Sequence, residues 1–142
     1  MDTRRFALIL GVVFTLVGIL GFVPGINQMH HADDHHLIVT GPGTGYLLGL
    51  FHVNVLHNLV HILFGAMGIA MARSAGSAVL YARIVAIGYG LLTVMGLIPA
   101  LNTTFGLIPI HGADVILHAL IAAVAAYFGF AHHAAPATPA HA

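Results

Sequence analysis

The amino-acid sequence predicts an all-α membrane protein, a bundle of four transmembrane helices. Three observations lead to this prediction: 59% of the 142 residues are hydrophobic, only 6% are Asp, Glu, Lys or Arg, and several apolar runs are long enough to span a bilayer. An ordinary soluble domain has about 25% charged residues, which give it a polar surface. The composition therefore excludes a soluble enzyme and a nucleic-acid-binding protein, since the latter needs a basic surface.

Each apolar run is close to the length of roughly 20 residues that a spanning helix needs. The expected helices cover about residues 6–23, 46–72, 78–99 and 112–130. Inside a bilayer these runs form helices, because backbone groups in hydrocarbon must bond to one another. We expect residues 1–131 to form one transmembrane domain. Residues 132–142, rich in Ala, Pro and His, then form a disordered tail.

The arginines predict the orientation of the helices. Arg4 and Arg5 precede the first apolar run, and Arg73 and Arg83 flank the connection between the second and third runs. The other two connections contain no Lys or Arg. Because loops rich in Lys and Arg remain in the cytoplasm, we expect a multi-pass membrane protein with both termini cytoplasmic.

Two parts of the chain repeat one pattern. Residues 21–27 and 96–102 share the order Gly, apolar, apolar, Pro, small, apolar, Asn, and a Leu-His pair recurs at His57 and His118. We interpret the first two and the last two helices as duplicated hairpins, so that these two histidines face one another. Glycine and proline at helix ends also produce part of such a pattern independently.

Polar side chains recur at helical spacing in the second and fourth runs. His57 and His61 are four residues apart and share a helix face, as do Asp114 and His118. Polar groups are costly in hydrocarbon and normally face the interior of a bundle. We therefore expect one shared polar cluster in the outer half of the membrane. His52 and His111 are secondary candidates for metal ligands, and the supporting polar residues expected beside the cluster are Asn54, Asn58 and Tyr89.

Several functions are compatible with this cluster. With no cysteine and twelve histidines in the chain, imidazole is the abundant metal ligand. The leading hypothesis is a zinc, copper or nickel site formed by His57, His61, Asp114 and His118. Asp114 would act as a ligand, or it would orient a histidine through a hydrogen bond to the ring nitrogen that does not bind the metal. Alternatives are a b-type haem between two histidines, a proton relay, or a purely structural cluster that holds the bundle together.

No motif for a nucleophile, a phosphate loop or paired catalytic carboxylates is present, so we do not predict an enzyme. The expected partners are the lipid bilayer and either further copies of the chain or a larger membrane complex, in which the protein would be an accessory subunit. The first outer connection is a weaker metal-binding candidate or simply a solvated loop. Its histidines, which accompany Asp33 and Asp34, are His30, His31, His35 and His36.

Two runs, GLFHVNVLHNLVH at residues 49–61 and GLIPIHGADVILH at residues 106–118, carry a family resemblance. They resemble a bacterial family of small four-span membrane proteins that is classed as a domain of unknown function. The resemblance covers most of the chain and implies four helices in the plasma membrane, but no established activity, substrate or cofactor. His52 departs from the family pattern, in which proline is usual at that position, and the histidine-rich loop lies outside the pattern. The polar positions of the family are matched by His57, His61, Asp114 and His118.

Overall fold

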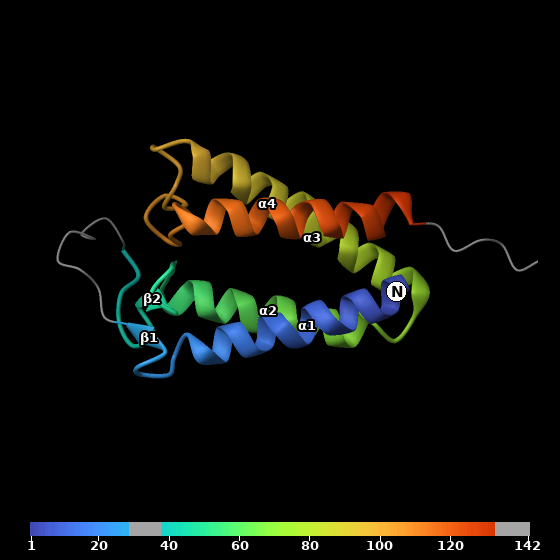
Figure 1. Ribbon diagram of the computed structural model, residues 1–142, viewed down its shortest axis with the longest axis horizontal. Helices are drawn as coiled ribbons and strands as arrows, with labels where there is room; N and C mark the ends of the chain where they lie inside the picture. Colours follow the sequence, from blue (N-terminus) through green and yellow to red (C-terminus); the bar gives the residue numbers. More distant parts are fainter. Residues whose placement is uncertain (29–37, 133–142) are drawn as a thin grey trace, which may run out of the picture.

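The computed structural model of the chain describes residues 1–28 and 38–132. In chain order the elements are α1 (Thr3–Leu20), β1 (Asn27–Gln28), β2 (Gly45–Leu47), β3 (Phe51–Val53), α2 (Val55–Met71), α3 (Ala75–Leu97), α4 (Ala113–Ala126) and the π-helix η1 (Tyr127–Ala131). The helix α1 packs along α2, and α3 packs along α4, which gives two hairpins side by side (Figure 1). This arrangement confirms the predicted four-helix bundle.

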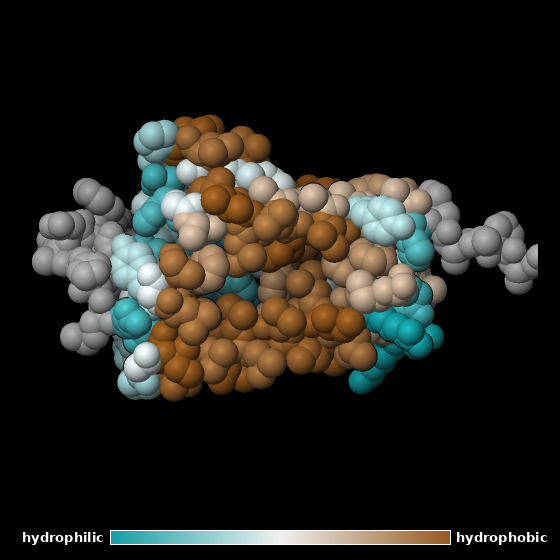
Figure 2. Space-filling model, in the orientation of Figure 1, coloured by the Kyte–Doolittle hydropathy of each residue, from teal (hydrophilic) through white to brown (hydrophobic). Residues whose placement is uncertain are grey.

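The helices have the length and surface of membrane spans. By length and composition, α1, α3 and the continuous helix Ala113–Ala131 can each cross a membrane, while α2 is slightly shorter, with 17 residues. Figure 2 shows hydrophobic residues along the middle of the molecule and hydrophilic residues gathered at its two ends. The protein is therefore a multi-pass membrane protein, because so large an apolar surface is unfavourable in water.

The end of the molecule that contains the N-terminus also gathers the arginines. The Nε atom of Arg4 donates to the carbonyl oxygen of Ala72, at the end of α2, over 3.0 Å. Arg83 in α3 donates in the same way to Gly129 of η1 over 2.8 Å. The three strands lie at the opposite end of the bundle (Figure 1). The two ends are called the arginine end and the strand end below.

The prediction of a helix over residues 46–72 is wrong for its first part. Residues 45–53 contain β2 and β3, which pair antiparallel in a sheet of order β1-β2-β3. The helix α2 begins only at Val55, because the side chain of Asn54 accepts a hydrogen bond from the backbone N–H of His57 at 2.8 Å and caps the helix. Apolar strands and apolar helices have the same hydropathy, so the apolar run alone could not locate this boundary.

Glycines allow α1 and α2 to approach closely. A Cβ atom on Gly11 would lie 2.7 Å from the backbone nitrogen of Ile69, and one on Gly65 would lie 2.6 Å from that of Thr15. Both distances are too short for real contacts, so only glycine fits. Close backbone packing of this kind is typical of helices in membranes, where association depends on van der Waals contact.

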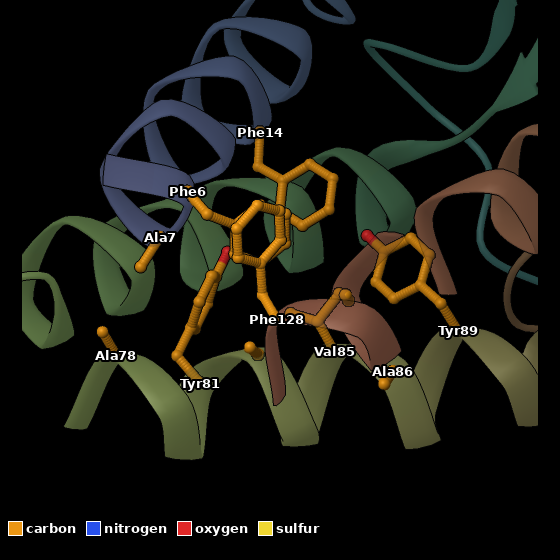
Figure 3. Close-up of a cluster of buried hydrophobic side chains, with 11 residues drawn as sticks. Phe6, Ala7, Phe14, Ala78, Tyr81, Val85, Ala86, Tyr89 and Phe128 are labelled. Carbon is orange, nitrogen blue, oxygen red and sulfur yellow. The ribbon is translucent and has the colours of Figure 1, made fainter. Parts of the chain in front are cut away.

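Aromatic side chains fill the core between α1, α3 and the end of α4. Phe6 stacks on Phe128 with ring centroids 4.5 Å apart, and Phe14 stacks on Tyr89 at 5.3 Å. Tyr81 lies fully buried in the same cluster (Figure 3). This aromatic core closes the half of the bundle near the arginine end.

Residues 133–142, most of the predicted tail, lie outside the described residues, so its disorder stays a prediction. The first residue of the predicted tail, His132, is described and differs from the expectation. Its ring lies 5.4 Å from that of Phe128, measured between centroids, and 5.6 Å from that of Tyr127. The ordered chain therefore extends at least one residue into the expected tail.

Candidate metal centre

Three buried imidazoles meet between α2 and α4 and are called the imidazole cluster: His57, His61 and His118. The ring centroids of His57 and His61 are 4.6 Å apart, and those of His57 and His118 are 6.2 Å apart. Their exposed fractions are 4%, 8% and 2%, in chain order. The structure therefore brings three of the predicted ligands together in the interior rather than toward the lipid.

Helix starts determine where this cluster lies. Because Asn54 caps α2, His57 falls in the first turn, and His61 follows one turn deeper on the same face. The helix α4 begins at Ala113 with Asp114 in its first turn, and His118 follows one turn later. Both helices start at the strand end, so the cluster lies in that half of the bundle.

The hydrogen bonding of His61 leaves one ring nitrogen available to a ligand. Its Nδ1 lies 3.1 Å from the carbonyl oxygen of His57. A carbonyl oxygen only accepts, so Nδ1 carries the proton and Nε2 keeps a free lone pair. Metal-binding histidines are commonly oriented in this way, by a hydrogen bond from the other ring nitrogen to a backbone carbonyl.

Unpartnered polar atoms gather beside these rings. Within the described parts of the chain, seven buried side-chain polar atoms have no hydrogen-bond partner. Three of them are His57 Nδ1, His118 Nδ1 and Asp114 Oδ2, and these three residues line one cavity. Buried polar groups are normally paired, so these three atoms are available to bind a water molecule, an ion or a ligand.

The cavity has a volume of about 100 Å³. Its polar lining is the imidazole cluster together with Asp114, whose carboxyl also faces the backbone of His52. Its apolar lining consists of Val17, Leu47, Leu48, Phe51, Val53, Leu117 and Ile121. A second cavity, of about 60 Å³, shares the three imidazoles and reaches Tyr89 and Phe64. The cluster therefore lies between two small cavities.

His52 and His111 form a separate pair at the strand end. The His52 Nδ1 and His111 Nε2 atoms are 3.1 Å apart, a hydrogen-bond distance, and Tyr46 stacks on His52. His52 belongs to β3 rather than to the expected helix. Neither histidine of this pair is among the residues that line the two cavities. We therefore assign them to a link between loops rather than to the imidazole cluster.

The predicted supporting residues divide into two groups. Asn54 donates to the carbonyl oxygens of Val39 and Leu107, and Asn58 donates to that of Gly43, so both amides hold loops onto α2. Tyr89 contacts the cluster directly, with its ring centroid 4.9 Å from that of His118 in an edge-on arrangement.

The sequence did not indicate every neighbour of the cluster. Phe14 of α1 lies edge-on to His61 at 5.5 Å, and no pattern in its surroundings distinguishes it from other apolar residues of that helix. The predicted loop ligands lie outside the described residues, in the segment 29–37: His30, His31, His35 and His36.

The geometry fits a single metal ion better than haem. Among residues 1–28 and 38–132, no three His, Cys, Asp or Glu side chains form a ready-made metal-binding group. Two imidazoles that share a zinc ion have ring centres about 5–6 Å apart, given Zn–N bonds of about 2.0–2.1 Å. The spacings of 4.6 and 6.2 Å in the cluster lie on either side of this range. A cavity of about 100 Å³ has no room for haem, since pockets for far smaller molecules measure roughly 300–1,000 Å³.

The fold and the cluster define a class of protein: a multi-pass helical membrane protein with a buried group of histidines. The chain belongs to a particular family of this kind, described as a domain of unknown function (DUF4383), whose match covers residues 4–131. This membership confirms the resemblance drawn from the sequence. No curated protein and no solved structure matches the chain.

Proposed function

We propose that this membrane protein binds one transition metal ion through His57, His61 and His118. Zinc, copper and nickel are the ions suited to imidazole ligands. Asp114 serves as a fourth ligand or orients His118 from one turn away. The observation that supports this proposal is the set of unpartnered buried atoms, His57 Nδ1, His118 Nδ1 and Asp114 Oδ2, around one cavity.

A bound ion would pair polar atoms that have no hydrogen-bond partner among the described residues. A buried polar atom without a partner costs about 1–3 kcal/mol, and three such atoms surround the same cavity. A metal ion bonded to the imidazole nitrogens removes these penalties together. The carboxylate of Asp114 offsets part of the charge of the ion, which matters because an isolated charge is expensive in hydrocarbon.

We further propose that the cluster lies in the outer half of a bacterial plasma membrane, with both termini in the cytoplasm. The hydrogen bonds of Arg4 and Arg83 are at the arginine end, opposite the strands, and Lys and Arg favour the cytoplasmic side. In this orientation the strand end faces outward, and the histidines of the segment 29–36 supply metal to the cluster as a weaker site.

The metal content of the purified protein tests the proposal. The protein is extracted in mild detergent with an affinity tag that contains no histidine, and the metal is measured by elemental analysis. A background variant with asparagine at positions 30, 31, 35 and 36 removes the contribution of the loop. We expect stoichiometric metal in this background and its loss in the variant His57→Gln/His118→Gln. The matched control is His132→Gln, which changes a histidine at the arginine end and should leave the metal content unchanged.

The pH dependence gives a second measurement on the same samples. A protonated imidazole cannot bind a metal, so the occupancy is complete at neutral pH and falls as the pH is lowered. Folded, native protein that contains no metal at neutral pH would contradict the proposal. Co-purified partner chains in that case would support the alternative of an accessory subunit in a membrane complex.

A further inference from the structure

A surface cavity of about 320 Å³ lies at the arginine end, between the start of α1 and the end of α2. Its lining consists of Asp2, Arg4, Arg5, Leu8 and Ala72. None of these residues lines either cavity of the imidazole cluster, so this cavity is separate from the candidate metal centre. Figure 2 shows hydrophilic surface at this end, directly beside the hydrophobic middle of the molecule. The cavity therefore lies where the polar surface meets the membrane-spanning surface.

The lining of the cavity has a net positive charge. Arginine stays protonated in proteins, so Arg4 and Arg5 contribute two positive charges against the one negative charge of Asp2, a net charge of +1. The carboxylate of Asp2 already accepts a hydrogen bond from the backbone N–H of Arg5 at 2.8 Å. A ligand with one negative charge neutralises the cavity, whereas a neutral ligand leaves one positive charge uncompensated. The cavity thus favours an anion.

The two guanidinium groups differ in how they are held. The Nε atom of Arg4 donates to the carbonyl oxygen of Ala72 over 3.0 Å, which fixes this side chain across the gap between α1 and α2. Within residues 1–28 and 38–132, the side chain of Arg5 and the Nη groups of Arg4 form no hydrogen bond. Guanidinium N–H groups bind the oxygens of a phosphate in pairs. The cavity therefore offers one fixed and one adaptable donor group to a phosphate.

An apolar line of side chains runs along α1 from the cavity towards the middle of the bundle. Residues four apart share a helix face, so Leu8, Val12 and Leu16 follow Arg4 on one face of α1 and are called the apolar stripe. All three are exposed, by 42–53%, on a helix that can cross a membrane. From Arg4 to Leu16 the helix rises about 18 Å, comparable with the roughly 15 Å of hydrocarbon in one leaflet. A ligand with a charged end and a long apolar chain matches this arrangement.

We infer that the cavity binds the headgroup of one anionic phospholipid, of which phosphatidylglycerol is the representative. Its phosphate pairs with Arg4 and Arg5, and an acyl chain lies along the apolar stripe. Basic pockets between membrane-spanning helices bind anionic headgroups in this way. Phosphatidylcholine and phosphatidylethanolamine have no net charge and leave the cavity with an uncompensated positive charge. Inorganic phosphate has the charge but no apolar chain for the stripe.

Native mass spectrometry of the full chain measures this binding. The protein is freed of endogenous lipid in detergent and titrated with phosphatidylglycerol, phosphatidylcholine or phosphatidylethanolamine that have identical acyl chains. We expect the first phosphatidylglycerol molecule to bind about tenfold more tightly than either of the other two lipids. Equal affinities for the three lipids would overturn the inference. Displacement of bound phosphatidylglycerol by inorganic phosphate would overturn it as well, because the apolar stripe would then contribute nothing.

Two substitutions that change the charge in opposite directions test the lining. Arg5→Gln removes a positive charge from a side chain without a hydrogen bond in the described bundle, and the affinity for phosphatidylglycerol should fall about fivefold. Asp2→Asn removes the negative charge, keeps a capping oxygen and should raise this affinity by a similar factor. Partial unfolding cannot produce a rise in affinity, so Asp2→Asn decides the matter even if Arg5→Gln folds poorly. A fall in affinity for Asp2→Asn would overturn the inference, because the carboxylate would then contribute to binding.

Arg83→Gln is the matched control. It removes the same charge at the same end, but Arg83 donates to Gly129 and lies over the ring of Phe130, outside the cavity lining. The affinity for phosphatidylglycerol should stay within about twofold of that of the natural protein. An equal loss in Arg5→Gln and Arg83→Gln would show that the lipid responds only to the total charge of this end, and the assignment to the cavity would fail. The metal content should be the same in all three variants, since none changes the imidazole cluster.

Discussion

The imidazoles of His52 and His111 lie at hydrogen-bond distance, 3.1 Å between Nδ1 and Nε2. His52 belongs to β3, which leads into α2, and His111 belongs to the loop that leads into α4. The bond therefore joins the two hairpins at the strand end, just before the helices that carry the imidazole cluster. Its effect on the cluster is positional, since it holds the starts of α2 and α4 together.

A double-mutant cycle on this pair should reveal a coupling. Replacing either histidine by phenylalanine leaves the other without this partner, whereas replacing both removes the interaction entirely. We expect a coupling free energy of about 0.5–1.5 kcal/mol between His52→Phe and His111→Phe. The free energy of unfolding in detergent, measured for the two single variants and the double variant, gives this value. Strictly additive effects would show that the bond contributes nothing.

Asn54 combines two roles, which substitutions can separate. Its side-chain oxygen caps α2 through the backbone N–H of His57, and its amide nitrogen donates to Val39 and Leu107. Asn54→Ser keeps an oxygen that can cap the helix but loses the two hydrogen bonds that the amide nitrogen donates. Asn54→Ala loses the cap and both of these hydrogen bonds. We expect the free energy of unfolding to decrease from the natural protein to Ser and further to Ala, with the cap accounting for about 0.5–2 kcal/mol. Equal stability of the two variants would contradict the capping role.

Gly65 should not tolerate alanine. A Cβ atom there would lie 2.6 Å from the backbone nitrogen of Thr15, so α1 and α2 would have to separate. We expect Gly65→Ala to destabilise the protein by about 1–3 kcal/mol, as overpacking does elsewhere. Gly88→Ala is the matched control, because nothing lies within 4 Å of its added Cβ atom. Alanine is the better helix former, so this control should be neutral or stabilising in the same unfolding assay.

The start of α1 should fray in acid. The side chain of Asp2 accepts a hydrogen bond from the backbone N–H of Arg5, and this bond lowers the pKa of its carboxyl below the usual value of 3.8. A lowered pKa means that the carboxylate stabilises the folded helix start at neutral pH, and that this contribution is lost as the pH falls through the lowered value. The protection of the first-turn amides, measured as the intrinsic exchange rate divided by the observed rate, should therefore decrease below about pH 4. Asp2→Asn keeps an uncharged cap, and its exchange should not change with acidification beyond the intrinsic rate.

The number of helices and their location in a membrane could be predicted from the lengths of the apolar runs and the number of charged residues. Four apolar runs and eight charged residues suffice for a four-helix membrane bundle, since each span needs hydrocarbon-compatible side chains. The start of α2 did not follow, because residues 46–53 are apolar whether they form strands or a helix. The signal for this boundary was present in Asn54, which is a preferred residue for helix caps.

The grouping of His57 with His61, and of Asp114 with His118, could be inferred from spacing, because helical geometry determines which residues share a face. The approach of the two helices could be expected only from the cost of burying polar groups in lipid. Helical spacing and the cost of burial do not predict the contacts that loops make. The His52–His111 bond and the donation of Asn54 to Leu107 depend on a connection, residues 98–112, that has no periodic pattern.

The aromatic core lies between the arginine end of the bundle and the imidazole cluster. Phe6 and Phe128 stack on one another, Phe14 stacks on Tyr89, and Tyr81 is fully buried beside them. Phe14 and Tyr89 also contact the imidazoles of His61 and His118, so the aromatic core extends from the arginine end up to the imidazole cluster. Since α2 and α4 begin at the strand end and carry the three histidines within their first two turns, the imidazoles lie nearer to that end of the bundle than to the arginine end.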